Sequence, residues 1–570
     1  MSIFKNIYYL RDKSYSSPAI CLKDKPHNSM IRVFLALLIV MLVTASLSTF
    51  SFADEISEKI TENAAAESTE DTSEGIIEGA GESTPSDELS AYDMKGKKIG
   101  VITGGSTSTL VTDFLEGDLD LQLLNSNVDM AIALDSGKID AYVTDMYSAR
   151  DMCMAYEGQY VLEPKVASAP AGFIFKKNDK EKTALKEQMN EYLAKIRADG
   201  TWQEIYDIWM NYDEEKKVVD IPSTGENGTL IMGTSSQIGN QFCFMKDGTL
   251  VGFEIDIAAR FCKEYGYGLK VVDYDYSALV AAVTSGKIDF AGDSIMQTPA
   301  RLENVDFSDE TCEMGFVLVA KKETAAASET DTSFFESIKT SFINTFVTEN
   351  RYLLFINGII TTLLIVVLSI ILGSALGFFV FMLCRKGNKA ANKITGFFSW
   401  LVHGMPVVVL LMILYYIIFG SSKISGTVIS IIAFTLVFAV GVIAMLKSGV
   451  AAIDKGQMEA ALALGYKNRE AFFKLILPQA AMHFMPSYKA EIVSLIKATA
   501  VVGYIAVQDL TKISDFIRSR TFEPFFPLIA TAVIYFLLAG ALNFIVKQVE
   551  IKLDTKRRSK EVILKGAVLK

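Results

Sequence analysis

The pattern of hydrophobic and polar positions divides the chain into regions of different character. Residues 54–93 are rich in Glu, Ser, Thr and Ala and contain few bulky apolar side chains, so we expect a disordered acidic linker. Residues 94–322 alternate short apolar runs with polar turns, as a soluble domain does. After a second polar linker, 323–343, residues 344–556 consist mainly of long apolar runs. A soluble domain followed by a membrane domain is therefore predicted.

The apolar runs of the membrane domain are long enough, or nearly so, to cross a membrane as helices. They are Leu353–Cys384, Phe397–Phe419, Thr427–Met445, Ile492–Gln508 and Phe525–Val546. The fourth run is marginal, because charged side chains crowd its start. The pattern predicts an all-α polytopic membrane domain of five helices.

One long polar segment, Gly456–Pro478, interrupts this domain between the third and fourth runs. Asp454 and Gln457 have the spacing of a capping box, which predicts a helix over Met458–Leu464. Gly465 then stands where a left-handed residue ends a helix.

A second short helix is expected after that glycine. Asn468 is the expected cap, the helix covers Arg469–Leu477, and Pro478 is expected to close it. This helix is too apolar for a free loop. A knob of two helices with such a surface needs a partner to cover it.

The soluble region contains an internal repeat. SGKIDAYVTD at 136–145 recurs as SGKIDFAGDS at 285–294, each after a helical run. Each copy also follows a strand and a turn of small residues, at 97–108 and 229–237. Strand, turn, helix and a strand ending in a carboxylate predict two α/β lobes with a ligand cleft between them.

Composition and charge exclude several other classes. The net charge of −11 argues against nucleic acid as a partner. Six scattered cysteines without a CxxC pair and only three histidines make a metal site or a disulfide framework unexpected. A single pair among Cys153, Cys243, Cys262 and Cys312 stays open. No GxxxxGK[ST] loop occurs and no catalytic grouping can be argued, so we expect neither a cofactor nor an enzyme activity in this chain.

Both ends of the chain bear on its placement in the membrane. Basic residues precede the apolar run Val33–Ala45, and Ser51-Phe52-Ala53 resembles a signal-peptidase site, so residues 1–53 are either a cleaved signal peptide or an N-terminal anchor. Residues 557–570 form a basic tail. Four basic residues follow the first apolar run: Arg385, Lys386, Lys389 and Lys393. The excess of positive charge predicts that Gly456–Pro478 and the C-terminus are cytoplasmic and the soluble domain is extracytoplasmic.

The polar segment resembles the EAA loop of permease subunits of ABC importers. The resemblance rests on fixed identities spread over about twenty positions: Gly456, Glu459, Ala460, Ala461, Gly465, Leu477 and Pro478. In that family the loop docks into a groove of a separate ATP-binding subunit. The resemblance therefore implies a cytoplasmic ATPase partner that contacts 456–478. The apolar runs predict a plasma-membrane protein in contact with lipid. Because five spans are few for a pathway, we expect two copies of the chain to pair around one axis.

The soluble region resembles the type II solute-binding proteins of polar amino acid uptake, but with its parts in another order. Residues 94–217 resemble the second lobe and the C-terminal helices, and 218–322 resemble the first lobe. One circularly permuted binding protein accounts for this order. Two half-degraded binding proteins are the alternative. The fold class implied is a two-lobed periplasmic-binding-protein-like α/β domain followed by the membrane domain.

The same resemblance implies the ligand-binding residues. Arg301 matches the arginine that binds the ligand carboxylate, and Asp145 matches the aspartate that binds its ammonium group. The other candidates are Ser106, Thr107, Ser294, Thr298 and Phe242. Because the segment before Phe242 lacks the usual aromatic platform and Asp293 adds a charge, the ligand side chain stays open: a cation, a thioether or a non-standard amino acid.

Together these features predict the substrate-binding and permease subunit of an ABC importer, with an amino acid as the expected solute. Two other classes stay open. One is a ligand-binding membrane sensor without transport, although no signalling helix follows the apolar runs. The other is a channel similar to glutamate receptors, although such receptors insert the pore between the lobes, and here both lobes precede every apolar run.

Overall fold

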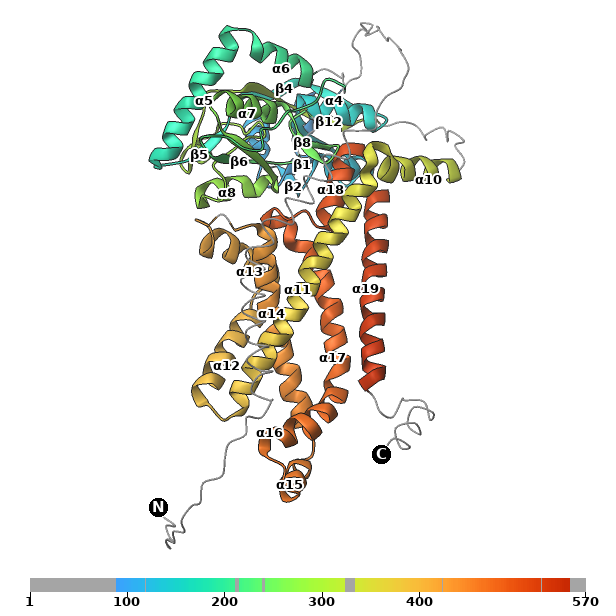
Figure 1. The fold of residues 1–570 in the computed structure, drawn as a ribbon. Helices are drawn as coiled ribbons and strands as arrows, with labels where there is room; N and C mark the ends of the chain where they lie inside the picture. The colour runs from blue at the N-terminus through green and yellow to red at the C-terminus, as the bar shows by residue number, and fades with distance from the viewer. Residues whose placement is uncertain are drawn as a thin grey trace, which may run out of the picture. The chain divides into compact units, whose positions relative to one another are not determined.

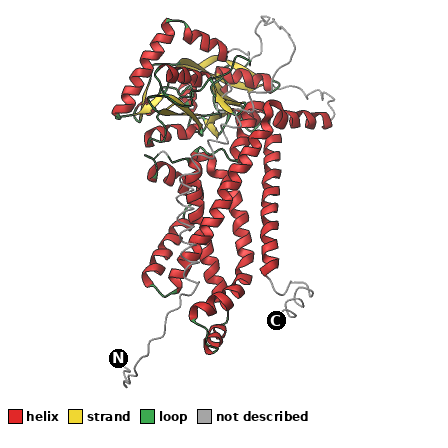
Figure 2. Ribbon diagram, in the orientation of Figure 1, coloured by secondary structure: helices red, strands yellow, loops and turns green. Residues whose placement is uncertain are grey.

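The computed structural model describes residues 89–553 except 118, 211–214, 238–240, 323–333, 423 and 524. The predicted signal or anchor, most of both predicted linkers and the C-terminal tail lie outside these residues. Within the described residues, every strand falls between residues 98 and 321, and the part from 334 to 553 is mainly helical (Figure 2). The predicted order of an α/β domain and a helical membrane domain is confirmed.

One of the two lobes, called lobe A below, is built on a five-stranded sheet in the order β2-β1-β3-β12-β4 (Figure 1). Its strands are β1 (Lys98–Ile102), β2 (Asp120–Leu124), β3 (Ala141–Asp145), β4 (Gln159–Ala171) and β12 (Cys312–Lys321). The helices α2 (Thr107–Leu115), α3 (Asn127–Asp135) and α4 (Met146–Ala155) connect them. β1 pairs in parallel with β2 and β3, while β12 is antiparallel to β3 and β4. All five residues of β3 are buried, as expected for a central strand covered on both faces.

The other lobe, called lobe B below, has a sheet in the order β11-β5-β10-β6-β9. Its strands are β5 (Ile174–Lys176), β6 (Thr229–Thr234), β9 (Gly268–Asp273), β10 (Phe290–Ala291) and β11 (Val305–Phe307). A hairpin of β7 (Phe244–Lys246) and β8 (Thr249–Val251) adds to it, with the helices α5 (Lys180–Ala198), α6 (Thr201–Met210), α7 (Phe253–Glu264), α8 (Leu279–Ser285) and α9 (Pro299–Leu302) and the short 3-10 helix η2 (Tyr276–Ala278).

The chain passes between the lobes twice, from β4 to β5 and from β11 to β12. As a result β5 joins the sheet formed by later strands, and β12 joins the sheet formed by earlier ones. The predicted repeats lie at the ends of equivalent strands: Asp145 ends β3, and Asp293 follows β10 by two residues. Both carboxylates therefore reach the edge where the lobes face each other.

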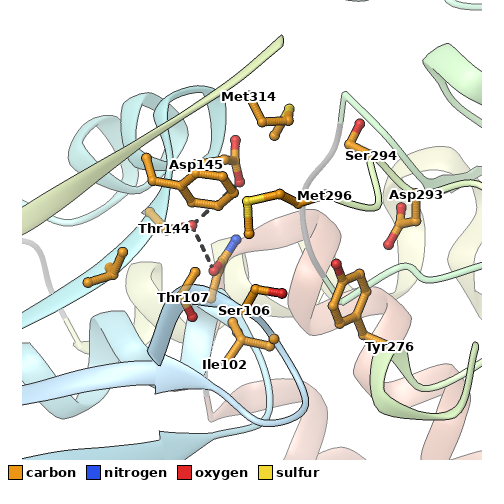
Figure 3. Close-up of a pocket in the computed structure, with 14 residues that line it drawn as sticks. Ile102, Ser106, Thr107, Thr144, Asp145, Tyr276, Asp293, Ser294, Met296 and Met314 are labelled. Carbon is orange, nitrogen blue, oxygen red and sulfur yellow. Dashed lines mark hydrogen bonds between the residues drawn. The ribbon is translucent and has the colours of Figure 1, made fainter. Parts of the chain in front are cut away.

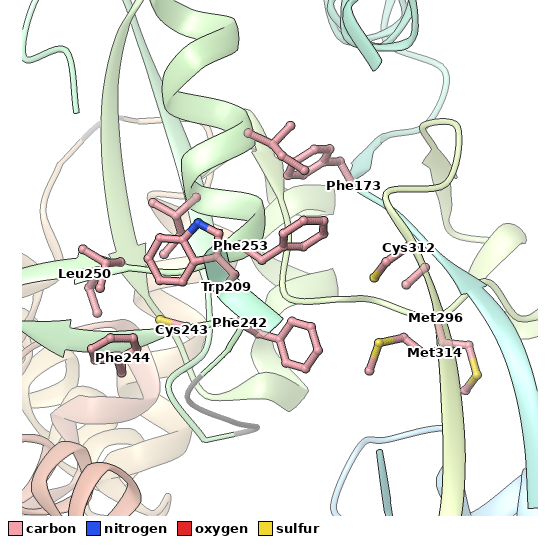
Figure 4. Close-up of a cluster of buried hydrophobic side chains, with 14 of the residues drawn as sticks. Phe173, Trp209, Phe242, Cys243, Phe244, Leu250, Phe253, Met296, Cys312 and Met314 are labelled. Atoms are coloured by element: carbon pink, nitrogen blue, oxygen red, sulfur yellow. The ribbon is translucent and has the colours of Figure 1, made fainter. Parts of the chain in front are cut away.

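The helices α5 and α6 pack onto lobe B. Trp209 of α6 is fully buried and donates from its indole N–H to Asp256 Oδ2 of α7 at 3.1 Å. Trp202 lies edge-on to Phe253, also of α7. Phe242 is 1% exposed in the same apolar cluster (Figure 4). The four cysteines of the soluble domain are free thiols, so the structure contains no disulfide among them.

Among the described residues of the membrane domain, three helices are long and apolar enough to cross a membrane, or up to five if each of two bent pairs counts as one span. The long ones lie in 338–385, Gly426–Ala451 (α14) and Phe526–Gln548; the first is mostly α11 (Arg351–Arg385), and the last belongs to α19 (Phe526–Leu553). The predicted second run is not one helix, because α12 (Lys389–His403) and the helix Val407–Ile418 meet at 108°. The bend lies at Pro406, which cannot donate a backbone hydrogen bond.

The predicted fourth run is also part of a bent pair. Helix continues from Asn468 to Ile505 and includes α17 (Leu477–Ala498), and α18 (Leu510–Thr521) follows at 55°. The remaining helix, α10 (Phe334–Phe342), lies in the segment expected to be a linker.

The polar segment forms two short helices, as predicted, but the second does not end where expected. α15 (Lys455–Ala463) begins after Asp454, whose carboxylate accepts from the Gly456 N–H at 2.6 Å. Gly465 has φ +85°, the left-handed conformation that ends the helix.

The second helix, α16 (Asn468–Ala471), is capped at Lys467 rather than Asn468. It then runs through a π turn, Phe472–Ile476, into α17. Pro478 lies in the first turn of α17, where its missing N–H costs little, so the prediction that it closes the helix was wrong.

Candidate functional site

A cavity lies between the two lobes (Figure 3). Lobe A contributes the start of α2 and the end of β3, and lobe B contributes η2 and the segment after β10. Apolar side chains complete the lining, among them Met296, Met314 and Phe316. Four of the predicted ligand-binding residues line it: Ser106, Thr107, Asp145 and Ser294.

Asp145 is buried and has two different carboxylate oxygens. Oδ1 caps α4 by accepting from the backbone N–H groups of Tyr147 and Ser148, at 3.0 and 2.8 Å. Oδ2 lies 3.5 Å from the Thr144 hydroxyl. Burial raises the pKa of Asp145, while the Ser148 side chain and the backbone N–H groups of Ser148 and Tyr147 oppose the shift. The fold thus holds this carboxylate from the α4 side, and Asp145 also lines the cavity.

The N-terminus of α2 also lies on the lobe A wall, and its polarity is opposite to that of Asp145. No side chain caps this helix, because the Ser106 hydroxyl makes no capping hydrogen bond. The Thr107 hydroxyl is buried and has no hydrogen-bond partner. Unpaired N–H groups and the helix dipole make such an end suited to an anion.

The predicted carboxylate ligand, Arg301, is not among the lining residues. Its guanidinium donates to the Met296 carbonyl at 3.0 Å and to the Tyr276 hydroxyl at 3.3 Å. Both of these residues line the cavity, so Arg301 lies directly behind its lobe B wall. Its role as carboxylate ligand stays a prediction.

Two further candidates lie away from the cavity lining. The Thr298 hydroxyl caps α9 by accepting from the Arg301 N–H at 3.3 Å. The Phe242 ring lies edge-on to Tyr147, with ring centroids 6.0 Å apart, and is buried in the core. Their predicted contacts with a ligand stay predictions.

The structure adds a carboxylate to the site that was noticed in the sequence but given no role. Asp293 lines the cavity, is 1% exposed, and has no hydrogen-bond partner on either oxygen. The next residue, Ser294, adopts φ +48°, uncommon for a residue with a side chain, and its N–H donates to Glu254 Oε2 at 2.7 Å. This turn aims Asp293 into the cavity. Its position two residues after a strand, as Asp145 ends another, was the available signal.

A second, larger cavity of polar character lies beside the first. It is lined by Asp275 and Ser277, which flank the Tyr276 of the first cavity, and by Lys512 and Arg518 of α18. Lys512 Nζ lies 2.8 Å from both Asp273 Oδ2 and Asp275 Oδ1 of lobe B. Arg518 pairs with Asp129 of lobe A at 2.6 Å. A single helix of the membrane domain thus holds both lobes through charge pairs.

Comparisons with known proteins agree with this architecture. Residues 111–212 and 230–457 match the family of bacterial extracellular solute-binding proteins, family 3. Residues 369–554 match the binding-protein-dependent transport system inner membrane component. The chain belongs to both families. It is a permease fused to a solute-binding domain, as the sequence resemblance predicted.

The relatives of this fused permease are permease proteins. The putative glutamine transport system permease of Rickettsia felis is 30% identical over 208 residues, which cover 36% of this chain and 94% of that protein. The arginine transport system permease of Bacillus subtilis is 35% identical over 206 residues, 35% of this chain and 92% of that protein. The histidine/lysine/arginine/ornithine transport system permease of Escherichia coli is 25% identical over 204 residues, 34% of this chain and 86% of that protein.

The two-helix knob of the fused permease is exposed but anchored at its base. Leu464 is 79% exposed and Leu462 41% exposed, beside the exposed Glu459. Phe472 in contrast is fully buried, and the Arg385 guanidinium of α11 lies 3.9 Å from the centre of its ring. The knob is therefore fixed to α11 and presents an apolar tip.

Proposed function

We propose that this protein is the substrate-binding and permease subunit of an ABC importer for amino acids. The observation that carries the proposal is the combination, in one chain, of a solute-binding domain with a permease whose relatives are named as glutamine and arginine permeases. The soluble domain captures the solute outside the cell, and the membrane domain moves it inward.

The cavity supports an amino acid as the solute. The α2 N-terminus, with Ser106 and Thr107, accepts the α-carboxylate, and Asp145 Oδ2 accepts the α-ammonium group. Arg301 adds positive charge from lobe B. Its guanidinium has five N–H donors and makes two hydrogen bonds in the structure, so donors remain for the ligand. Groups from both lobes then contact one ligand, so ligand binding favours the closed arrangement.

Energy comes from a separate ATP-binding subunit that docks on Gly456–Pro478. The exposed Leu462 and Leu464 at the tip of the knob suit a groove on that subunit, and the buried Phe472 transmits its movement to α11. The knob and the C-terminus are cytoplasmic, and both lobes are extracytoplasmic. Up to five spans are few for a pathway, so two copies pair around it, with lipid on the remaining apolar surface.

The circularly permuted order of the binding domain belongs to this proposal as well. The two passages between the lobes and the packing of α5 and α6 on lobe B support one complete binding protein rather than two half-degraded ones.

Uptake in proteoliposomes tests the function. The full chain is reconstituted with an ATP-binding subunit from the same cell, and radiolabelled amino acids are supplied on the side of the binding domain. We expect ATP-dependent accumulation of at least one amino acid. Binding of amino acids without any ATP-dependent accumulation would instead favour a sensor, and ATP-independent ion current would favour a channel.

A further inference from the structure

The Asp293 carboxylate lines the cavity without a partner, and an amino acid with a neutral side chain does not explain this feature. Neither oxygen accepts a hydrogen bond, and the side chain is almost completely buried. A buried carboxylate without partners is costly and is normally paired or bound to a cation. Asp293 faces the cavity, so its missing partner would have to come from there (Figure 3).

The groups around Asp293 already have partners of their own. Glu254 of α7 accepts from the Thr311 hydroxyl and from the Ser294 N–H. Asp273 of β9 forms its ion pair with Lys512.

The remaining neighbours do not satisfy Asp293 either. Thr234 of β6 lies near enough to lower the pKa of Asp293, yet its hydroxyl makes no hydrogen bond of normal geometry. Cys243, the other neighbour, is a buried thiol. Burial and the charges of Glu254, Asp273 and Asp145 raise the pKa of Asp293 well above its ordinary value. Asp293 alone among these carboxylates has neither a hydrogen-bond nor an ion-pair partner.

With both carboxylates ionised, the charges of the site balance with a cationic ligand. Arg301 contributes one positive charge, and Asp145 and Asp293 contribute two negative ones. An amino acid with a neutral side chain gives Asp293 no counter-charge, so Asp293 then keeps its proton. An amino acid with a positively charged side chain brings the sum to zero and lets Asp293 ionise.

The wall between the two carboxylates suits the stem of such a side chain. Met296 lies between Asp145 and Asp293 in Figure 3, and Met314 lies nearby. Methionine side chains are flexible and apolar, and they pack well against a chain of methylene groups. Tyr276 and Phe316 also line the cavity, and the Tyr276 ring already lies against a cation, with the Arg301 guanidinium 5.6 Å from its centre.

We propose that Asp293 binds the cationic end of the ligand side chain, so that the cleft selects amino acids with a positively charged side chain. This inference rests on the proposed function and specifies its solute class. Asp145 and the α2 N-terminus bind the main-chain end of the ligand, and Asp293 binds its side chain.

Calorimetry on the full chain in detergent tests the proposal with arginine and citrulline, which have nearly the same shape but differ in side-chain charge. We expect arginine to bind about 100-fold more tightly than citrulline, the loss typical of a broken buried charge pair. Asp293→Asn, which keeps the shape, should weaken arginine by a similar factor and leave citrulline within about threefold. The matched control Asp145→Asn should weaken both ligands.

The pH dependence gives a second readout. Because the pKa of Asp293 is raised in the empty protein, a cation must displace its proton, and the affinity for arginine should rise as the pH rises. Citrulline should show a smaller rise, and Asp293→Asn should remove the difference between the two ligands. Equal slopes for both ligands in the wild-type protein contradict the proposal.

The outcomes separate this inference from the function beneath it. If citrulline or glutamine binds as tightly as arginine, Asp293 does not select charge, and amino acid import stands. If Asp293→Asn leaves arginine affinity unchanged, the assignment of the residue is wrong. If none of the twenty standard amino acids binds, both the inference and the proposed amino acid solute fall.

Discussion

At the scale of single residues, Asp145 combines a structural task with a binding task. Its carboxylate caps α4 and also lines the cavity. Asp145→Ala should cost about 1 kcal/mol of stability through the lost cap and also abolish binding. Asp145→Asn can still cap with its carbonyl oxygen, so it should keep the melting temperature while losing the affinity. Equal destabilisation by both variants in a thermal melt would show that the charge, and not the cap, holds α4.

A ligand that lacks the α-carboxylate tests the anion-binding role of the α2 N-terminus separately from the rest of the site. Thr107→Val removes the unpartnered hydroxyl while keeping the shape of the side chain. If the α-carboxylate binds there, arginine affinity should fall about tenfold, the worth of one charge-assisted hydrogen bond. Agmatine, which is arginine without its carboxylate, should bind Thr107→Val and the wild type equally. An equal loss for both ligands in calorimetry would mean that Thr107 supports the wall instead.

At the scale of elements, the knob at 455–476 should act in coupling without acting in ligand binding. Glu459 is exposed on α15, so Glu459→Arg should leave the fold intact and disturb only a docked partner. We expect unchanged ligand affinity and a loss of ligand-stimulated ATPase of tenfold or more, from charge reversal in an interface, an effect of about 1.4 kcal/mol or greater.

The control for that experiment lies on the same helix. Gln457→Arg adds a similar charge about 200° away around α15, since each residue turns an α-helix by about 100°. It should keep ATPase activity near the wild-type value. ATPase activity that survives Glu459→Arg, or that falls equally in both variants, would argue against docking through this face.

Elements with a local cause were predictable from the sequence, and elements set by distant packing were not. The Asp454 cap and the left-handed Gly465 depend on a few neighbouring residues, and both were predicted correctly. Pro478 was misjudged because a π turn upstream lets the helix run through it. In the site, the positions of Asp145 and of the turn before α2 could be predicted from the internal repeat of the soluble region. The unpartnered state of Asp293 depends on how β10, α7 and β9 pack, and no local pattern shows that.

At the scale of the whole molecule, α18 connects the binding domain to the membrane domain through Lys512 and Arg518, one for each lobe. Lys512 is almost fully buried between Asp273 and Asp275, so its removal leaves two carboxylates without their cation, which costs about 4 kcal/mol. That cost falls on the docked arrangement, because an undocked lobe B exposes the same carboxylates to water. Lys512→Met should therefore leave ligand affinity nearly unchanged and reduce ligand-stimulated ATPase and uptake in proteoliposomes.

A double-mutant cycle decides whether the loss comes from this contact. Asp275→Asn alone should weaken coupling less than Lys512→Met, because Asp273 still pairs with the lysine. If Lys512 and Asp275 act as a pair, the double variant should lose clearly less than the sum of the two single losses in ATPase activity. Arg518→Met removes the lobe A pair and should add independently to Lys512→Met, since Asp129 belongs to the other lobe. Additive losses for Lys512 and Asp275 would show that the ion pair seen between lobe B and α18 does not carry the coupling.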